Sequence, residues 1–215
     1  MALGMAIRVA SGRIGAWAAA GAGLRTASRV ACPAAPSIAS GGAFSTATCD
    51  LTDAHMPDPV DRAEKSTSVR VVSPAMGFRD FGAVTAFHGQ AVTISCFENN
   101  PLVREALMDE KGEGRVLVVD GGGSMRCALL GDMIAGAGAE NGWSGVIIHG
   151  CVRDSAVLAT VPMGIKALAT HPLKSSKRDR GLRGVPVVLG DVVVSSGDYV
   201  YADVDGILIS KEPLA

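Results

Sequence analysis

Aromatic residues are scarce in this 215-residue chain, at 4% of the sequence, and charged residues make up only 19%. The five cysteines are odd in number and include no Cys-x-x-Cys pair, so a disulfide framework or a zinc site is not expected. The net charge of −1 gives no bulk electrostatic sign of a nucleic-acid partner. What remains is a chain with 48% hydrophobic residues, enough for one domain with a sizeable core.

Acidic residues and lysine are absent from residues 1–49, which contain four arginines (Arg8, Arg13, Arg25 and Arg29). The net charge of the whole chain is −1, so the residues that follow this segment carry a net charge of −5. An acid-free, Ala/Ser/Gly-rich start with spaced arginines is typical of an organelle transit peptide. The alternative is a disordered tail that carries no targeting signal. We predict a transit peptide over residues 1–44 and a mitochondrial location, with the plastid as the alternative compartment.

The longest uncharged apolar stretch of that segment, Ile14–Leu24, is too short and too rich in Gly and Ala to span a membrane. The predicted cut lies near Phe44–Ser45. Residues 45–215 then form a single domain, for which we expect neither a membrane nor a nucleic-acid partner.

Short runs of Val, Ile, Ala and Gly between turns indicate an α/β domain. Strands are predicted at 69–72, 90–96, 115–120, 145–149, 165–169, 185–189, 192–195, 198–202 and 207–210. Helices are predicted at 51–55, from Asn100-Pro101 onward, from about Met125 to Asn141 with an interruption at Gly131-Asp132, and at 154–159. Residues 56–69 and the basic segment 171–184 are predicted loops.

The stretch Val118-Val-Asp-Gly-Gly-Gly-Ser124 leads from a strand into a glycine turn. It lacks the Gly-Lys-Ser/Thr ending of a phosphate-binding loop and the full Gly-x-Gly-x-x-Gly spacing, so a structural turn is the favoured interpretation.

Asp132 follows a glycine inside a predicted helical stretch and is first interpreted as a helix N-cap. In the functional interpretation, the bare amides at Asp132, Met133 and Ile134 hold a substrate carboxylate. Arg153 and Asp154 follow the strand 145–149, where open α/β sheets place ligands. Arginine matches a carboxylate and aspartate suits Mg²⁺, but a surface ion pair and a helix cap explain the two residues equally well.

Three neighbouring features rank lower as site candidates. His149 lies in an apolar strand and is predicted to be a satisfied core histidine. Cys151 is treated as a packing residue, since it has no evident activating partner. The basic segment 171–184 is predicted to be a solvated loop, with steering of dianionic substrates as the alternative.

Four segments together resemble one family: VLVVDGGGSMRCALLGD, NGWSGVIIHGCVRD, MGIKALATHP and VSSGDYVYADVDGILIS. The family comprises the regulators of ribonuclease E activity and the 4-hydroxy-4-methyl-2-oxoglutarate aldolases, and the resemblance runs from about Thr48 to Leu214. Its aldolase branch carries an aspartate, 20 intervening residues, and then Arg-Asp. Asp132, Arg153 and Asp154 match that spacing, so the chain resembles the aldolase branch.

The resemblance implies a compact RraA-like sandwich of mixed β-sheets flanked by helices, of the swivelling ββα type. It further implies a homotrimer or dimer of trimers with active sites between subunits, to which a neighbouring subunit adds a residue that we do not identify. Gly131, Asp132, Met133, Ile134 and Arg153 would bind a small 2-keto acid, and Asp154 would anchor Mg²⁺ or Mn²⁺.

The mechanism expected from this resemblance is a Schiff-base-free, metal-dependent (class II) aldol cleavage that releases pyruvate, with oxaloacetate decarboxylation as a side activity. No lysine lies in a candidate pocket strand, which disfavours imine chemistry. Arg153 would stabilise the enolate and Asp132 would orient the water that takes the proton. The alternative is a non-catalytic protein that regulates a ribonuclease or RNA helicase through its surface.

Overall fold

The computed structural model describes residues 46–56 and 68–214. They fall within one compact unit, Gly42–Ala215. The predicted transit peptide at 1–44 and most of the predicted loop at 56–69 lie outside the described residues.

The described strands, in chain order, are β1 (Val69–Val71), β2 (Arg79–Asp80), β3 (Phe87–Ser95), β4 (Val116–Asp120), β5 (Ala128–Leu130), β6 (Gly145–Val152), β7 (Gly164–Thr170), β8 (Leu182–Arg183), β9 (Val187–Leu189), β10 (Val192–Val194), β11 (Tyr199–Ala202) and β12 (Ile207–Ser210). Ten of them form one mixed sheet in the order β1-β12-β11-β3-β4-β6-β7-β2, with β5 paired to β6 and β8 to β3. β9 and β10 form a separate antiparallel pair. The predicted α/β fold with mixed sheets is confirmed.

The central strands β3, β4, β6 and β7 run parallel and are covered on both faces. Along β4, Leu117 and Val119 pack into one hydrophobic cluster, whereas Val116 and Val118 pack into another on the opposite face. This burial of successive residues explains the unbroken apolar run of the strand, because neither face of a doubly covered sheet meets water.

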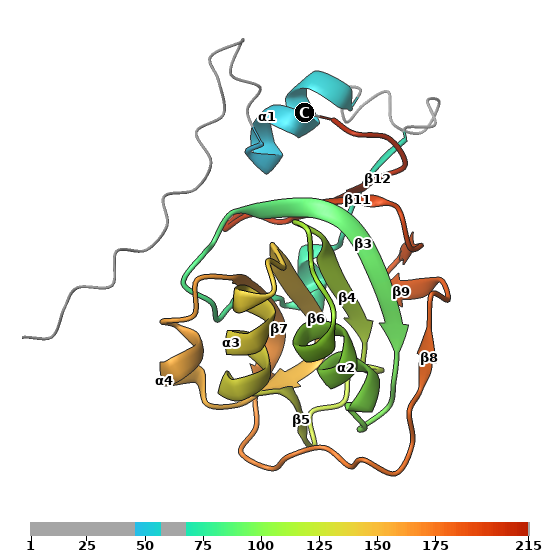
Figure 1. Cartoon of the computed structure of the whole chain (residues 1–215). Coiled ribbons are helices and arrows are strands. Elements are labelled where there is room, and N and C mark those ends of the chain that lie inside the picture. Colours follow the sequence, from blue (N-terminus) through green and yellow to red (C-terminus); the bar gives the residue numbers. More distant parts are fainter. Residues whose placement is uncertain (1–45, 57–67, 215) are drawn as a thin grey trace, which may run out of the picture. The chain divides into compact units, whose positions relative to one another are not determined.

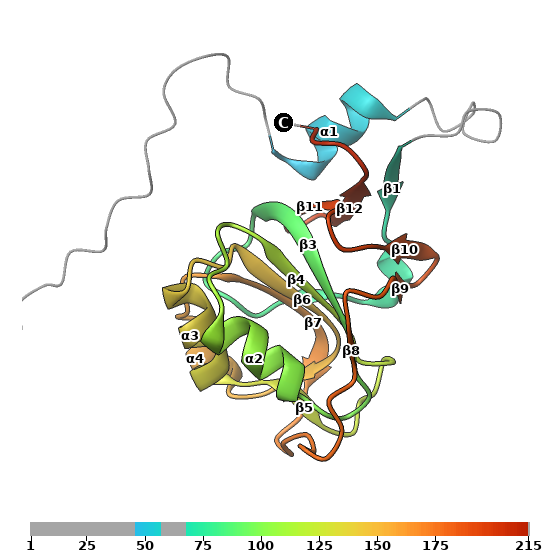
Figure 2. The same ribbon diagram turned by 45° about the vertical axis from the view of Figure 1, so that its right-hand side comes forward.

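Helices α2 (Pro101–Asp109), α3 (Asp132–Glu140) and α4 (Ser155–Leu158) cover one face of the parallel strands (Figures 1 and 2). α2 begins at Pro101, and proline is tolerated there because the first N–H of a helix has no hydrogen-bond partner within the helix. The buried face of α2 consists of Leu102, Val103, Ala106 and Leu107. The Asn141 side-chain amide donates to the carbonyls of Leu107 and Met108, which satisfies two acceptors at the end of α2.

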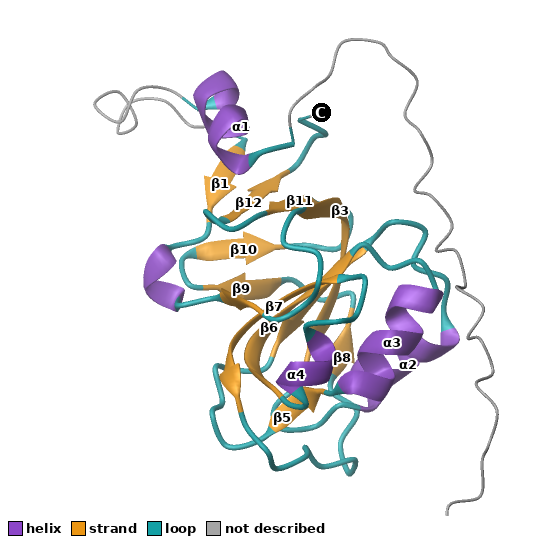
Figure 3. Ribbon diagram, turned by 90° about the vertical axis from the view of Figure 1, so that its left-hand side faces the viewer, coloured by secondary structure: helices purple, strands orange, loops and turns teal. Residues whose placement is uncertain are grey.

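The other face is covered by the β9–β10 pair together with β11 and β12 (Figure 3). Helix α1 (Thr48–His55) is fixed at its first residue, whose amide and hydroxyl donate to the buried Asp203 carboxylate at 2.7 and 2.8 Å. The 3₁₀ helix η1 (Pro74–Met76) and β2 lie in a stretch for which the sequence predicted no element.

The predicted helix from Met125 to Gly131 is wrong, since this stretch contains β5. Ala128, Leu129 and Leu130 are each at most 3% exposed, and such a fully buried triplet has no polar side to present as a surface helix. The helix begins only at Asp132, as α3. No helix among the described residues is long and apolar enough to cross a membrane.

The β10–β11 connection depends on the Asp198 carboxylate, which is 5% exposed and accepts hydrogen bonds from Lys211 Nζ (2.7 Å), the Ser195 amide (3.1 Å) and Arg70 Nη2 (3.2 Å). Burial raises the pKa of this carboxyl, but these donors outweigh burial and the net pKa is lowered.

We therefore expect Asp198→Asn to lower the free energy of unfolding at pH 7 by about 2 kcal/mol, which is the usual contribution of a hydrogen bond to a charged group. A lowered pKa in the folded state stabilises the protein above the ordinary carboxyl pKa, and this contribution disappears as the pH falls through the lowered value. Urea unfolding should show a gap between wild type and variant at pH 7 that narrows below about pH 4. The exposed Asp191→Asn is the control, and an equal gap at both pH values would contradict this account.

Candidate active site

The candidate site lies where β5 and β6 end beside each other and α3 begins. The two strands are parallel, and the Arg153 amide donates to the Leu130 carbonyl at 2.9 Å just beyond their last paired residues. This bond places Gly131 and Asp132, which follow β5, next to Arg153 and Asp154, which follow β6. The three ionic residues selected from the sequence are therefore brought to one end of the sheet.

Gly131 allows a close approach between these two strand exits. A Cβ atom at this position would lie 2.8 Å from Asp154 Oδ2 and 3.1 Å from Arg153 Nε, so glycine allows both side chains to lie where they do and a larger residue would displace them. Arg153 Nε and Asp154 Oδ2 are themselves 3.2 Å apart, and both side chains are 38% exposed. The backbone of Asp154 is left-handed, with φ 58° and ψ 36°, a conformation that aspartate adopts more readily than most residues.

The N-cap of α3 is Gly131, not Asp132 as predicted. Asp132 is the first helical residue, and its Oδ1 accepts a hydrogen bond from the Met133 amide at 2.7 Å. Its carboxylate is half-buried and reaches the pocket described below. The Asp132 and Ile134 amides have no carbonyl partner within the helix, whereas the Met133 amide donates to the Asp132 carboxylate, so this end of α3 presents two donors and a partial positive charge.

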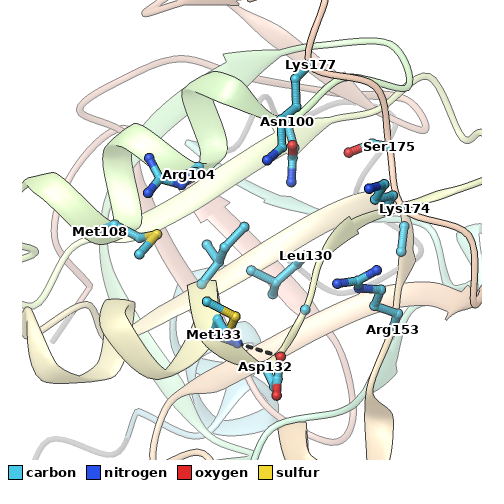
Figure 4. A pocket seen from close by; sticks show the side chains of 13 residues that line it. Asn100, Arg104, Met108, Leu130, Asp132, Met133, Arg153, Lys174, Ser175 and Lys177 are labelled. Carbon is cyan, nitrogen blue, oxygen red and sulfur yellow. Dashed lines mark hydrogen bonds between the residues drawn. The ribbon is translucent and has the colours of Figure 1, made fainter.

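A pocket of about 180 Å³ opens over β5 and the start of α3 (Figure 4). Gly131 to Ile134 and Arg153 all line it, whereas Asp154 does not. The remaining lining residues come from β5, α2 and the predicted basic loop: Ala128, Leu130, Asn100, Arg104, Met108, Lys174, Ser175 and Lys177.

The pocket is strongly cationic. Four basic side chains line it (Arg104, Arg153, Lys174 and Lys177), and Asp132 is its one acidic residue among those described. Because opposite charge attracts most strongly where water is partly excluded, such a lining favours a small anion. Lysine is indeed absent from the pocket strands, but Lys174 and Lys177 reach the pocket from the loop, which sequence reasoning left as a solvated or steering segment.

The residues from α2 were not predicted as site residues. Asn100-Pro101 marked the helix start, but nothing in the local spacing showed that Arg104 would face β5. Only the packing of α2 beside α3 brings them together.

Two lower-ranked features take structural roles in the described part of the chain. His149 is half-buried and its Nδ1 lies 3.0 Å from Asp120 Oδ1, and this hydrogen bond lowers the pKa of the Asp120 carboxyl. Asp120 also accepts from the Gly122 amide at 2.8 Å, within the glycine turn, where Gly122 and Gly123 both have φ 66°. Cys151 is 1% exposed and burial raises the pKa of its thiol, as expected for a packing residue.

No group of three or more His, Cys, Asp or Glu side chains that could hold a metal occurs among the described residues. Asp154 is an exposed carboxylate held by a single ion pair. One carboxylate of this kind fits Mg²⁺, which commonly takes one or two protein carboxylates and fills its remaining positions with water and substrate oxygens. A closed zinc-like site is not formed by these residues.

The sequence profile of the RraA-like family, described as Aldolase/RraA, matches residues 48–209. A protein from Alkalilimnicola ehrlichii with the provisional name 4-hydroxy-4-methyl-2-oxoglutarate aldolase is 56% identical over 146 residues, which are 68% of this chain and 89% of that protein.

Two solved structures share the fold. The RNA-processing inhibitor RraA from Thermus thermophilis matches with a TM-score of 0.68 and 42% identity, over 77% of this chain and 93% of that one. A Geobacillus kaustophilus protein described as an S-adenosylmethionine:2-dimethylmenaquinone methyltransferase matches with a TM-score of 0.68 and 43% identity, over 78% and 96%. These matches confirm the family resemblance predicted from the four sequence segments.

The predicted mitochondrial location, and its plastid alternative, is wrong. The curated relatives at about 50% identity are bacterial proteins, which gives no support to import into an organelle. The prediction relied on composition alone, and an acid-free segment with spaced arginines is not unique to transit peptides.

Gly131→Ala should displace the Arg153–Asp154 pair, because the new methyl group would lie against both side chains. Since the clashing atoms are the ends of flexible, half-exposed side chains, we expect the free energy of unfolding to change by no more than about 1 kcal/mol. A crystal structure of the variant and thermal unfolding test both statements.

Gly136→Ala, within the helix that Gly131 caps, is the control, since its added Cβ meets nothing within 4 Å. It should stabilise α3 by up to about 1 kcal/mol and leave the ion pair in place. A Gly131→Ala structure that keeps the 3.2 Å contact would refute the close-approach argument.

Proposed function

Because this chain belongs to the RraA-like family, we propose that it is a divalent-metal-dependent aldolase that cleaves 4-hydroxy-4-methyl-2-oxoglutarate to pyruvate. The observation that carries the proposal is the meeting of Arg153, Asp154 and the Gly131–Asp132 turn at one end of the sheet, beside a cationic pocket. A protein that acts only through its surface needs none of these groups in this arrangement.

Asp154 would hold Mg²⁺ or Mn²⁺, since its carboxylate is exposed and such an ion fills its remaining positions with water and substrate oxygens. Such a metal, when bound, polarises a 2-keto carbonyl and stabilises the negative charge that develops on its oxygen. The Arg153–Asp154 contact keeps the guanidinium beside this carboxylate.

The start of α3 binds the carboxylate next to the keto group. Helix N-termini favour anions, and residues 132–134 line the pocket, with the Asp132 and Ile134 amides as the donors without a carbonyl partner in the helix. Arg153 lines the same wall and places a fixed positive charge where the enolate oxygen develops, the position at which electrostatic stabilisation lowers the barrier.

Cleavage breaks the C3–C4 bond, leaves its electron pair in the pyruvate enolate and converts the 4-hydroxyl group to a ketone as its proton departs. Asp132 is the acidic residue of the pocket lining and would orient the water that takes this proton. Oxaloacetate decarboxylation forms the same enolate, so we propose it as a side activity. We also propose a homotrimer or dimer of trimers, with a neighbouring subunit completing the site.

The second candidate is regulation of a ribonuclease or RNA helicase through surface binding. It is favoured by the match to the Thermus protein, which is described as an RNA-processing inhibitor. The two functions are separated by a direct assay, because only the aldolase turns over a 2-keto acid.

Purified wild-type protein with Mg²⁺ should release pyruvate from 4-hydroxy-4-methyl-2-oxoglutarate, measured by coupling to lactate dehydrogenase. EDTA should abolish this release, and Asp154→Asn should do the same because it removes the metal-binding carboxylate. Arg153→Ala should lower kcat by about 100- to 1,000-fold, the usual effect of removing one oxyanion donor.

Asp191→Asn, which removes an exposed carboxylate between β9 and β10, should behave as wild type. Turnover that survives in Asp154→Asn would exclude the metal assignment. A folded wild-type protein that releases no pyruvate from any 2-keto acid with Mg²⁺ or Mn²⁺ would favour the regulatory function instead.

A further inference from the structure

A second cavity, of about 100 Å³, lies between β7, the stretch around η1 and the turn that joins β11 to β12. Among the described residues, none that lines this cavity also lines the pocket beside Arg153. Lys166 of β7 lines the cavity and pairs in register with Ile147 of β6, which packs into the hydrophobic cluster under β9 to β12. Since paired residues of neighbouring strands point to the same face, Lys166 lies on the face opposite to α2, α3 and α4.

Lys166 places a buried cation in the wall of this cavity. The residue is 3% exposed, and its Nζ lies 2.9 Å from Asp80 Oδ1 on the neighbouring strand β2. This contact is an ion pair without hydrogen-bond alignment, since Asp80 Oδ1 has no hydrogen-bond partner in the described part of the chain. The Lys166 ammonium donates no other hydrogen bond within that part. A lysine ammonium has three donors, and buried charges are normally hydrogen-bonded as well as paired, so Lys166 has donors available for a molecule in the cavity.

Asp205 supplies the opposite charge. It is exposed, and it lines the cavity from the turn between β11 and β12. The nearby Asp203 carboxylate is fully used, because it accepts from the amides of Thr48, Asp205 and Gly206 at 2.7, 2.9 and 3.2 Å. These bonds fix the turn. The Asp205 carboxylate accepts one weak hydrogen bond from the described residues, from Cys49 Sγ at 3.6 Å, and is therefore available to a ligand.

The remaining walls of the cavity are largely apolar. Val72 and Ile207 are 5% and 3% exposed, and Phe78 is half-buried. The Val72 amide donates to the Ile207 carbonyl at 2.9 Å, which fixes two of these walls to each other before any ligand binds. A cavity of about 100 Å³ holds a molecule the size of a few waters, each of which occupies about 30 Å³ in the liquid.

We propose that this cavity binds a small apolar α-amino acid. The carboxylate of the ligand accepts from Lys166, its ammonium group donates to Asp205, and its side chain packs against the apolar walls. A simple anion is disfavoured because Asp205 repels it, and a simple cation is disfavoured because Lys166 repels it, whereas a zwitterion is attracted to both charges. The site does not rest on the proposed function, since the two cavities share no lining residue among those described.

The test measures binding of L-alanine, of propionate, which lacks the ammonium group, and of ethylamine, which lacks the carboxylate. Saturation-transfer NMR in EDTA buffer suits such small ligands, for which we expect a Kd of about 1 mM. Wild type should bind L-alanine at least about 10-fold more tightly than ethylamine and about 5-fold more tightly than propionate. Equal affinity for L-alanine and propionate, or no transfer to L-alanine at about 20 mM, would overturn the proposal.

Asp205→Asn keeps the shape of the rim and removes its charge. It should bind L-alanine and propionate equally, because the ammonium loses its partner and the anion is no longer repelled. Asp109→Asn is the control, since it removes an exposed carboxylate from α2, on the other face of the sheet, and should keep the wild-type preference. A similar loss of preference in both variants would show general electrostatic attraction and exclude the assignment of Asp205.

The role of Lys166 is tested in the double variant Asp80→Asn/Lys166→Met, because Lys166→Met alone would leave the Asp80 carboxylate without its cation. The double variant should have a thermal midpoint no lower than that of wild type, and should bind L-alanine at least about 10-fold more weakly. Undiminished affinity in the folded double variant would contradict the assignment of the ligand carboxylate to Lys166.

The cationic pocket beside Arg153 also attracts small carboxylates, so Arg153→Ala identifies the cavity that gives the signal. Its affinity for L-alanine should equal that of wild type. Lost binding in Arg153→Ala, together with an unchanged preference in Asp205→Asn, would place L-alanine in the candidate active site and overturn the second site.

Discussion

The short parallel pairing of β5 with β6 is the interaction on which the candidate site depends. It places Leu130 and Arg153 within one backbone hydrogen bond of each other, and so sets the start of α3 against the Arg-Asp dipeptide. The approach is possible because Gly131 has no side chain at the point where Asp154 Oδ2 would meet a Cβ. A charged pair, a helix N-terminus and a half-buried carboxylate thereby share one end of an otherwise apolar sheet.

The rest of the fold makes this pairing rigid. The parallel strands are covered by helices on one face and by β9 to β12 on the other, so the strand exits extend from a densely packed core. The carboxyl ends of such strands are where open α/β sheets place ligands. Here the low overall charge of the chain makes the pocket distinctive, because its lining gathers four cations around a single acid.

The sequence predicted the parts of the structure whose signals are local. The apolar runs of β4 and β6 and the Pro-initiated α2 were found because burial on both faces and helix starts leave marks within a few residues. β5 was missed because Ala128–Leu130 becomes a strand only through its partner β6, and three buried residues carry no strand periodicity of their own. Likewise, Arg104, Lys174 and Ser175 reach the pocket through tertiary contacts. The spacing of Asp132, Arg153 and Asp154 was visible in the sequence. Only the structure shows that Asp132 and Arg153, with 20 residues between them, lie close together because β5 and β6 end side by side.

We propose that these groups stabilise a pyruvate enolate. Exchange of the pyruvate methyl protons with deuterated water measures that step without a carbon–carbon bond being broken. Wild type with Mn²⁺ or Mg²⁺ should accelerate the loss of the methyl signal in proton NMR spectra far above the buffer rate, and Arg153→Ala should not. Exchange at the buffer rate by folded, metal-supplemented wild type would contradict enolate stabilisation by this site.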